Sequence, residues 1–283
     1  DRERLRRIFA EHAPELVFHA AALKHVPLVE ANHFEGVMTN VVGTANVAET
    51  CRETGVEMMV LISSDKAVNP ANVMGATKRI AEQVCQAMDL ERDNGDGTRF
   101  VTVRFGNVLG STGSVVPLFQ RQLEEGGPLT VTDPQMTRYF MTIREAVELV
   151  LEASALGAER SDYTGKIFVL EMGDPVKILD LARQMIRLAG REPDKDIPIE
   201  IVGLRPGEKL HEELFHESEA LVATDYEGIL VGTPRAAESQ EIAKAVAALA
   251  AACAEADKAG LIETLRTLVP EFPGNASAHR KAA

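Results

Sequence analysis

The sequence predicts an α/β protein with a doubly wound parallel sheet, and three observations lead to this fold class. Short apolar runs alternate with helical patterns through the first two-thirds of the 283 residues. The runs are apolar throughout, as in strands that are buried on both faces of a parallel sheet. With 45% hydrophobic residues, a chain of this length can bury a sizeable core, and its size favours two lobes.

The predicted elements follow one another in chain order. Leu5, Ile8 and Phe9 already stand at helical spacing, so the chain enters a helix abruptly, which indicates a further segment upstream. The next predicted strands are Leu16–Ala20, Met58–Ser63 and Phe100–Phe105, and the helices between them are Phe34–Thr54 and Met74–Leu90.

After Asn107, glycines mark loops and the pattern indicates a second, smaller lobe. The predicted elements here are helices Ile143–Leu156 and Ile178–Ala189, strands Ile167–Leu170 and Ile199–Val202, and a short helix near Glu208–Phe215. We assign residues 1–108, with 138–170 packed back onto them, to the sheet domain. Residues 109–137 and 171–283 form the smaller lobe and a helical, Ala-rich tail over Ser239–Leu268, with 276–283 frayed.

Composition excludes several kinds of partner. The formal net charge of −13 argues against a nucleic-acid or anionic-membrane surface, because either needs a basic face. No apolar run approaches the ~20 residues of a membrane span, and no signal peptide precedes the first helix. Cys51, Cys85 and Cys253 form no CxxC pair and are too few for a disulfide framework, which indicates buried thiols in a reducing cytoplasm.

The most informative segment starts with Ser63-Ser64-Asp65-Lys66 and continues to Met74 and Lys78. A buried strand that ends in these residues delivers a hydroxyl, a carboxyl and an amine to the carboxyl edge of the sheet, where open α/β folds bind ligands. Lys78 follows Met74 by four residues, so both share a helix face and Lys78 can point at the same crevice. A capped turn with a surface ion pair is the alternative reading of this segment.

Six segments occur in an order that resembles a known family. They are 18–27 (FHAAALKHVP), 40–44 (NVVGT), 64–66 (SDK), 74–78 (MGATK), 104–110 (RFGNVLG) and 205–209 (RPGEK). Together they resemble the extended short-chain dehydrogenase/reductases, and among these the CapD-like polysaccharide-biosynthesis branch of UDP-N-acetylglucosamine 4,6-dehydratases. The resemblance covers residues 1–230 and implies a Rossmann-type NAD-binding domain with a lobe that binds a UDP-sugar.

The sequence departs from the family pattern in three places. The amino-terminal strand, glycine-rich turn and first helix are missing, no GxGxxG occurs anywhere, and Gly95-Asp96-Gly97 reads as a plain turn. Ser64 stands where the family usually has Thr, which keeps the hydroxyl. Met74 stands where most members have the Tyr that accepts the C4 proton. A Met there resembles the branch that retains configuration at C5, which often forms part of larger, membrane-anchored polypeptides.

The resemblance implies roles for Ser64, Asp65 and Lys66. A sugar that loses water across C5 and C6 is first oxidised at C4 by NAD, because the ketone acidifies the C5 proton. Lys66 is then the C5 base and Asp65 the C6 acid. A lysine does this near neutral pH only if its pKa falls from about 10.4 to roughly 7–8, and the pKa of the aspartate must rise. The acceptor of the C4 proton stays open between Asp65, Lys66 and a water near Lys78.

The resemblance also implies ligand-binding residues. Lys78 contacts the nicotinamide ribose, Asn40 ties the central helix to the cofactor site, and Ala20 and Ala21 flank the cofactor. On the substrate side, the implied residues are Lys24 and His25 for the sugar, Arg138 and Arg205 for the diphosphate, Asn107 for phosphate or sugar, and Glu208 for the uridine ribose. The alternatives are that Lys78 is a solvated helix residue, that backbone groups satisfy Asn40, and that the two arginines lie at the surface without binding a ligand.

His211 and His216 flank two glutamates but predict no zinc site. The metalloprotease motif needs histidines four apart on a helix, and these two are five apart, which turns them about 140° away from a shared face. We therefore expect no metal.

The sequence as a whole predicts an NAD-dependent UDP-N-acetylglucosamine 4,6-dehydratase of surface-polysaccharide assembly, retaining configuration at C5. One alternative is a UDP-hexose 4-epimerase, which shares the fold but needs no Asp-Lys pair and normally depends on the missing Tyr. The other is a nucleotide-sugar-binding module without turnover, which the missing NAD fingerprint favours. We expect a homo-oligomer in the cytoplasm, or at the cytoplasmic face of the inner membrane within an anchored polypeptide.

Overall fold

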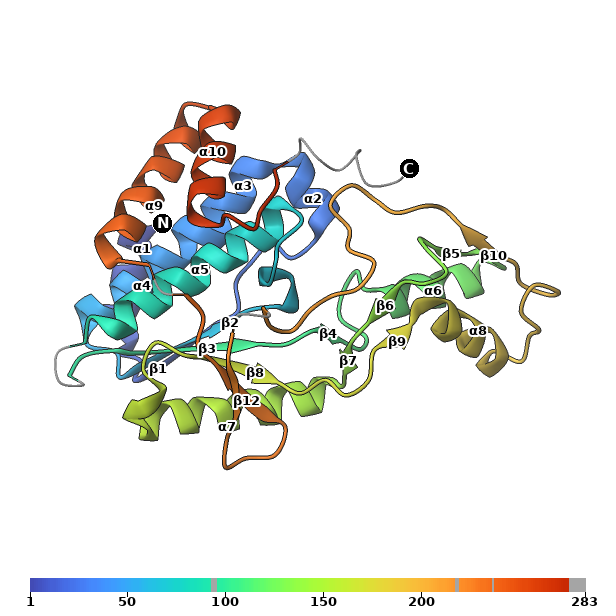
Figure 1. Cartoon of the computed structure of the whole chain (residues 1–283), viewed down its shortest axis with the longest axis horizontal. Coiled ribbons are helices and arrows are strands. Elements are labelled where there is room, and N and C mark those ends of the chain that lie inside the picture. Colours follow the sequence, from blue (N-terminus) through green and yellow to red (C-terminus); the bar gives the residue numbers. More distant parts are fainter. Residues whose placement is uncertain (93–95, 217–218, 236, 275–283) are drawn as a thin grey trace. The chain divides into compact units, whose positions relative to one another are not determined.

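The computed structural model describes residues 1–92, 96–216, 219–235 and 237–274, which fall into two compact units. The first unit comprises residues 1–105, 149–171 and those from 213 onward, and the second comprises 106–148 and 172–212. Figure 1 follows the elements along the chain. Gly95 of the expected Gly95–Gly97 turn and the expected frayed segment 276–283 lie outside the described residues.

A six-stranded sheet in the order β1-β2-β3-β8-β12-β11 forms the centre of the first unit. Its strands are β1 (Leu16–His19), β2 (Met58–Ile62), β3 (Arg99–Arg104), β8 (Ile167–Leu170), β12 (Ile229–Gly232) and β11 (Leu221–Ala223). The first four are parallel, and β12 and β11 join antiparallel. Every residue of β3 and β8 is buried, as their continuous apolar runs require. The predicted α/β class with a parallel sheet is confirmed.

Helices cover both faces of this sheet. Figure 1 shows α1 (Arg2–His12), α4 (Gly43–Thr54) and α5 (Val73–Leu90) over one face. On the other face, Gly157 of α7 (Ile143–Glu159) packs so closely on Val101 and Phe168 that a Cβ there would clash. The short elements of the unit are α2 (Val26–Ala31), α3 (His33–Val37), and the 3-10 turns η2 (Asp65–Ala67) and η3 (Ser161–Tyr163).

The carboxy-terminal tail packs on the sheet unit. Helices α9 (Ser239–Ala254) and α10 (Lys258–Leu268) bury Leu249, Leu261 and Leu265 in an apolar cluster with Val73 and Ile80 of α5. The predicted boundaries grouped this tail with the smaller lobe, and the structure groups it with the first unit. The reason is that α5 is buried almost all round and needs a cover on its outer face.

The helix predicted over 34–54 is present but not uniform. It consists of α3, the π-helical segment η1 (Met38–Val42) and α4 in direct succession. A π-helical turn inserts an extra residue into the helix and often marks a functional position. Here it carries Asn40, which is buried.

The second unit packs two helices on short strand pairs. Helices α6 (Val115–Glu124) and α8 (Ile178–Leu188) bury Phe119 and Ile186 against β5 (Leu129–Val131) and β10 (Ile199–Ile201). The remaining pairs are β4 (Asn107–Val108) with β7 (Phe140–Met141) and β6 (Thr137–Arg138) with β9 (Val176–Lys177).

The prediction of a short helix near Glu208–Phe215 is wrong, because these residues form bends and irregular loop. Two of the carbonyls that a helix would direct to its own N–H groups, those of Lys209 and Leu210, accept hydrogen bonds from Arg138 instead. Within the described ranges, no helix is both long and apolar enough to cross a membrane.

Candidate active site

In the turn after β2, two polar side chains contact one carboxylate. The Ser64 hydroxyl donates to Asp65 Oδ1 at 2.9 Å, and Lys66 Nζ donates to the same oxygen at 2.9 Å. Ser64 also caps η2 by accepting from the backbone N–H of Lys66 at 3.2 Å. Asp65 is fully buried, whereas the Lys66 side chain is 20% exposed. The turn therefore presents a carboxyl and an amine in direct contact, with a hydroxyl beside them.

The second carboxylate oxygen of Asp65 has no role in holding the turn. Oδ2 is buried, and it has no hydrogen-bond partner in the part of the chain that the structure describes. A buried polar oxygen is normally hydrogen-bonded, so Oδ2 is the atom of Asp65 that can still bind a further partner. This geometry suits a carboxyl group that delivers a proton.

Helix α5 meets this turn along one face. Gly75 lies so close to the Lys66 carbonyl that an added Cβ would overlap its oxygen. Lys78 Nζ donates to the Ile62 carbonyl at 2.6 Å, and Glu82 Oε1 accepts from the Ser63 hydroxyl at 2.6 Å. Residues 75, 78 and 82 follow a helical repeat and so face the same side. Burial lowers the pKa of Lys78 to about 8, against the opposing charge of Glu82.

Met74 lies in the same helix but contributes packing. Its side chain is 2% exposed and belongs to the apolar cluster that includes Leu249 and Leu261 of the tail. A thioether in this setting offers no proton acceptor of useful strength. The position therefore supplies shape to the helix that carries Lys78.

Asn40 fixes the loop that follows β1. Its Oδ1 accepts from the Leu23 N–H at 2.7 Å and its Nδ2 donates to the Leu23 carbonyl at 3.0 Å. Nδ2 also donates to the Thr77 hydroxyl of α5 at 3.0 Å. The predicted residues Ala20, Ala21 and Lys24 are exposed along this loop, and His25 is half-buried at the start of α2. Asn40 thus joins the loop to the helix that faces the turn.

Sequence reasoning missed His19, which closes β1 beside this network. Its Nε2 lies 2.9 Å from the Thr44 hydroxyl, and that hydroxyl donates to the Asn40 carbonyl. Nε2 must therefore carry the proton of a neutral ring. Burial, and secondly the charge of Lys78, lower the pKa of His19 to about 4. Its place within the FHAAA segment was the only available signal.

In the second unit, Arg138 is buried and organises the segment that contains Glu208. Its guanidinium donates to the carbonyls of Thr137, Lys209 and Leu210 and lies 3.7 Å from Glu208. Arg205 is exposed, and its N–H donates to Glu208 Oε2 at 3.1 Å, which closes the Arg-Pro-Gly-Glu turn. Arg138, Arg205 and Glu208 thus meet locally, whereas Asn107 is half-buried at the start of β4.

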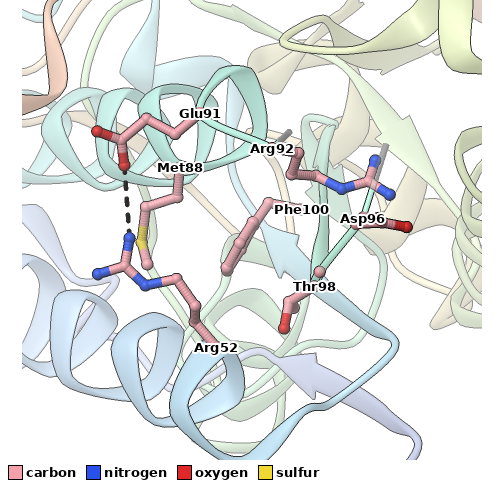
Figure 2. Close-up of a pocket in the computed structure, with 8 residues that line it drawn as sticks. Arg52, Met88, Glu91, Arg92, Asp96, Thr98 and Phe100 are labelled. Atoms are coloured by element: carbon pink, nitrogen blue, oxygen red, sulfur yellow. Dashed lines mark hydrogen bonds and ion pairs between the residues drawn. The ribbon is translucent and has the colours of Figure 1, made fainter. Parts of the chain in front are cut away.

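A separate cavity lies at the opposite end of β3 and α5 from the turn. It has a volume of about 300 Å³ and is lined by Arg52, Glu91, Phe100 and their neighbours. Figure 2 shows Arg52 reaching to Glu91, an ion pair of 3.4 Å. Because it lies at the amino ends of the strands, it belongs to no part of the Ser64–Lys66 site. No cluster of three or more potential ligands for a metal ion occurs among the described residues.

The parallel sheet, with polar side chains at the carboxyl end of β2, is typical of the Rossmann-type fold, in which ligands bind at this edge of the sheet. The chain belongs to the polysaccharide biosynthesis protein family, whose model matches residues 1–234. It is 56% identical over 232 residues to the capsular polysaccharide biosynthesis protein CapD of Staphylococcus aureus. That alignment covers 82% of this chain and 37% of CapD, so the chain spans little more than a third of that relative.

The relatives that are named for an activity include both dehydratases and epimerases. The chain is 36% identical over 235 residues to an inverting UDP-N-acetylglucosamine 4,6-dehydratase of Campylobacter jejuni, covering 83% of this chain and 65% of that protein. It is 39% identical over 217 residues to a UDP-glucose 4-epimerase of Rickettsia rickettsii, covering 76% and 60%. A Thermus thermophilus UDP-glucose 4-epimerase solved with NAD matches at TM-score 0.62 and 22% identity, covering 76% of this chain and 73% of that one, and shares the fold.

Proposed function

We propose that this chain is the catalytic part of an NAD-dependent UDP-N-acetylglucosamine 4,6-dehydratase. The observation that carries the proposal is the buried Asp65 in contact with Lys66 at the carboxyl end of β2. Elimination of water needs an acid at the C6 oxygen and a base at C5, placed side by side. An epimerase moves only the C4 hydrogen and has no use for such a pair.

The proton movements balance on these residues alone. The proton of the C4 hydroxyl reaches Asp65 through the Ser64 hydroxyl, which is hydrogen-bonded to Oδ1. The neutral Lys66 amine then takes the C5 proton while Asp65 gives its proton to the C6 oxygen, and the C6–O bond breaks to release water. Lys66 finally returns a proton to C5. Asp65 and Lys66 end in the state in which they began, and the C4 hydroxyl proton leaves in the water.

Residues of the first unit are proposed to hold one side of NAD. NAD supplies the oxidation at C4 and the hydride that returns to C6. Lys78, buried beside the turn, is the proposed donor to the nicotinamide ribose, and Asn40 is the proposed residue that orders the loop after β1. The sequence contains no glycine-rich turn for the pyrophosphate, which normally rests on such a turn at a helix amino-terminus.

The second unit is proposed to hold the UDP portion. Arg205 is exposed and can offer a planar, two-pronged contact to phosphate oxygens. Arg138 supports the segment that contains Glu208, because its guanidinium donates to the carbonyls of 137, 209 and 210. Glu208 and Asn107 remain the proposed contacts to ribose and to phosphate or sugar.

The proposed setting is the cytoplasm. Cys51 and Cys85 are buried free thiols, and burial raises the pKa of Cys51 to about 12, which keeps it protonated and unreactive. Such thiols suit a reducing compartment. Self-association and membrane anchoring of a longer polypeptide remain expectations from the family resemblance.

The polypeptide that contains this chain should convert UDP-N-acetylglucosamine into a nucleotide sugar that is lighter by one water. Mass spectrometry of the product, with NMR of its sugar ring, tests this. A product of unchanged mass with an inverted C4 centre would indicate the epimerase, for which the R. rickettsii relative is the supporting observation. An unchanged sugar that nevertheless binds would indicate a binding module.

A further inference from the structure

Behind the catalytic turn lies a buried network of charges. Glu82 of α5 is fully buried and accepts hydrogen bonds from Arg104 of β3, Nε to Oε1 at 3.1 Å and Nη2 to Oε2 at 2.8 Å. Arg104 is 1% exposed and also reaches Glu219 at 3.0 Å. Arg79 lies 3.2 Å from Glu82, so two cations meet two carboxylates. Each buried charge of this group thus lies beside an opposite charge.

The network touches the turn at one atom. Glu82 Oε1, which accepts from Arg104, also accepts from the Ser63 hydroxyl at 2.6 Å. Ser63 directly precedes Ser64, Asp65 and Lys66. Burial alone would raise the pKa of Glu82, but Arg104, Arg79 and the Ser63 hydroxyl together hold that pKa below its usual value. Glu82 is therefore favoured as an anion, which makes it a strong acceptor for Ser63.

The same two elements carry a second buried ion pair at their other ends. Arg99 starts β3 and Asp89 lies near the end of α5, with 5% and 1% of their surfaces exposed. Asp89 also accepts from the N–H groups of Phe100 and Gly165. This pair joins the same helix to the same strand away from the turn. Variants of it therefore report the effect of helix packing alone.

We propose that Glu82, oriented by Arg104, is a positioning residue that fixes Ser64, Asp65 and Lys66 for proton transfer by holding Ser63. Both buried ion pairs join α5 to β3, and the hydrogen bond to Ser63 is what distinguishes the Glu82 pair from the Asp89 pair. The kinetic part of the inference rests on the proposed function. The structural part does not, because the order of the turn can be measured without turnover.

The first experiment compares Glu82→Gln with Asp89→Asn, each of which neutralises one buried carboxylate. In the chain itself, hydrogen exchange is measured at the amides of Ser63 and Asp65, which donate to the carbonyls of Val103 and Phe105 at 2.8 and 3.0 Å. We expect faster exchange at 63–65 in Glu82→Gln only, relative to β3 amides in the same sample. Equal acceleration in both variants would overturn the proposal.

The second experiment uses the smallest change at the contact. Ser63→Ala removes the donor to Glu82 but leaves the ion pair to Arg104 intact, and Ser63→Thr restores the hydroxyl. In the polypeptide that contains this chain, we expect Ser63→Ala and Glu82→Gln to lower kcat by about 10- to 100-fold with KM nearly unchanged, since misplaced groups lose rate rather than binding. Ser63→Thr should recover most of the rate, and Asp89→Asn should keep kcat.

The outcomes separate this inference from the proposed function. If the wild-type polypeptide dehydrates no sugar but exchange at 63–65 still responds to Glu82→Gln alone, the function fails and the positioning role stands. If the wild type is active and Ser63→Ala keeps a normal kcat, the function stands and the positioning role fails.

Discussion

Asp65 Oδ1 accepts from both Ser64 and Lys66, so the three side chains share one hydrogen-bonded centre. The motif residues could be predicted from the sequence because Ser64, Asp65 and Lys66 are contiguous and follow an apolar strand. Glu82 and Arg104 could not, because a glutamate in a helix and an arginine at a strand end look like solvated residues. Only the fold shows that they are buried and face each other.

Removing the base should stop elimination without disturbing nucleotide binding. In the polypeptide that contains this chain, Lys66→Ala should lower the rate of dehydration by at least about 100-fold, the lower range for loss of a general base. Affinity for UDP should stay normal, because Lys66 acts on the sugar. Lys244→Ala, at an exposed position of α9, is the matched control. A near-normal rate in Lys66→Ala would remove Lys66 from the mechanism.

His19 should make the fold sensitive to mild acid. Its pKa is lowered to about 4 from a usual 6.5, so between these values the unfolded chain binds a proton that the folded chain does not. The free energy of unfolding should therefore fall as the pH drops from 6.5 to 4. His19→Gln, which keeps a donor for Thr44, should show a shallower fall in urea unfolding measured across this range. Parallel curves for both proteins would contradict the assignment.

At the scale of elements, the sheet and its helices were predictable because their apolar periods differ clearly. Two local features were not. The π-helical segment η1 leaves no mark in the hydrophobic period of residues 34–54, since its neighbours continue the same helix. The loop at 208–215 looks helical in sequence because the donors that take its carbonyls come from Arg138, about seventy residues away.

Gly75 should be required for the close approach of α5 to the turn. A Cβ at this position would overlap the Lys66 carbonyl and lie 2.9 Å from Pro70 Cβ. Gly75→Ala should lower the free energy of unfolding by about 1–3 kcal/mol, the usual range for overpacking. Gly43→Ala is the control, because its nearest contact is an ordinary 3.4 Å to the Met38 carbonyl. Urea denaturation that gave equal values for both would show that the approach is not tight.

At the scale of the whole chain, β1 is an edge strand of the described sheet, and its Leu16 and Phe18 side chains are about half exposed. An apolar edge of this kind favours association with another strand.

With no glycine-rich turn in the sequence, we predict that this chain binds NAD weakly or not at all. Calorimetric titration of NAD into this chain checks this, and tight binding would contradict it.

The central claim is that water is eliminated across C5 and C6 by a base that removes and returns the C5 proton, and heavy water tests it most directly. The polypeptide that contains this chain is incubated with UDP-N-acetylglucosamine in deuterium oxide, and the product is examined by NMR and mass spectrometry. The account predicts a UDP-4-keto-6-deoxy sugar with deuterium at C5, because the proton on Lys66 exchanges with solvent before it returns. An epimerised or unchanged sugar without deuterium at C5 would contradict the account.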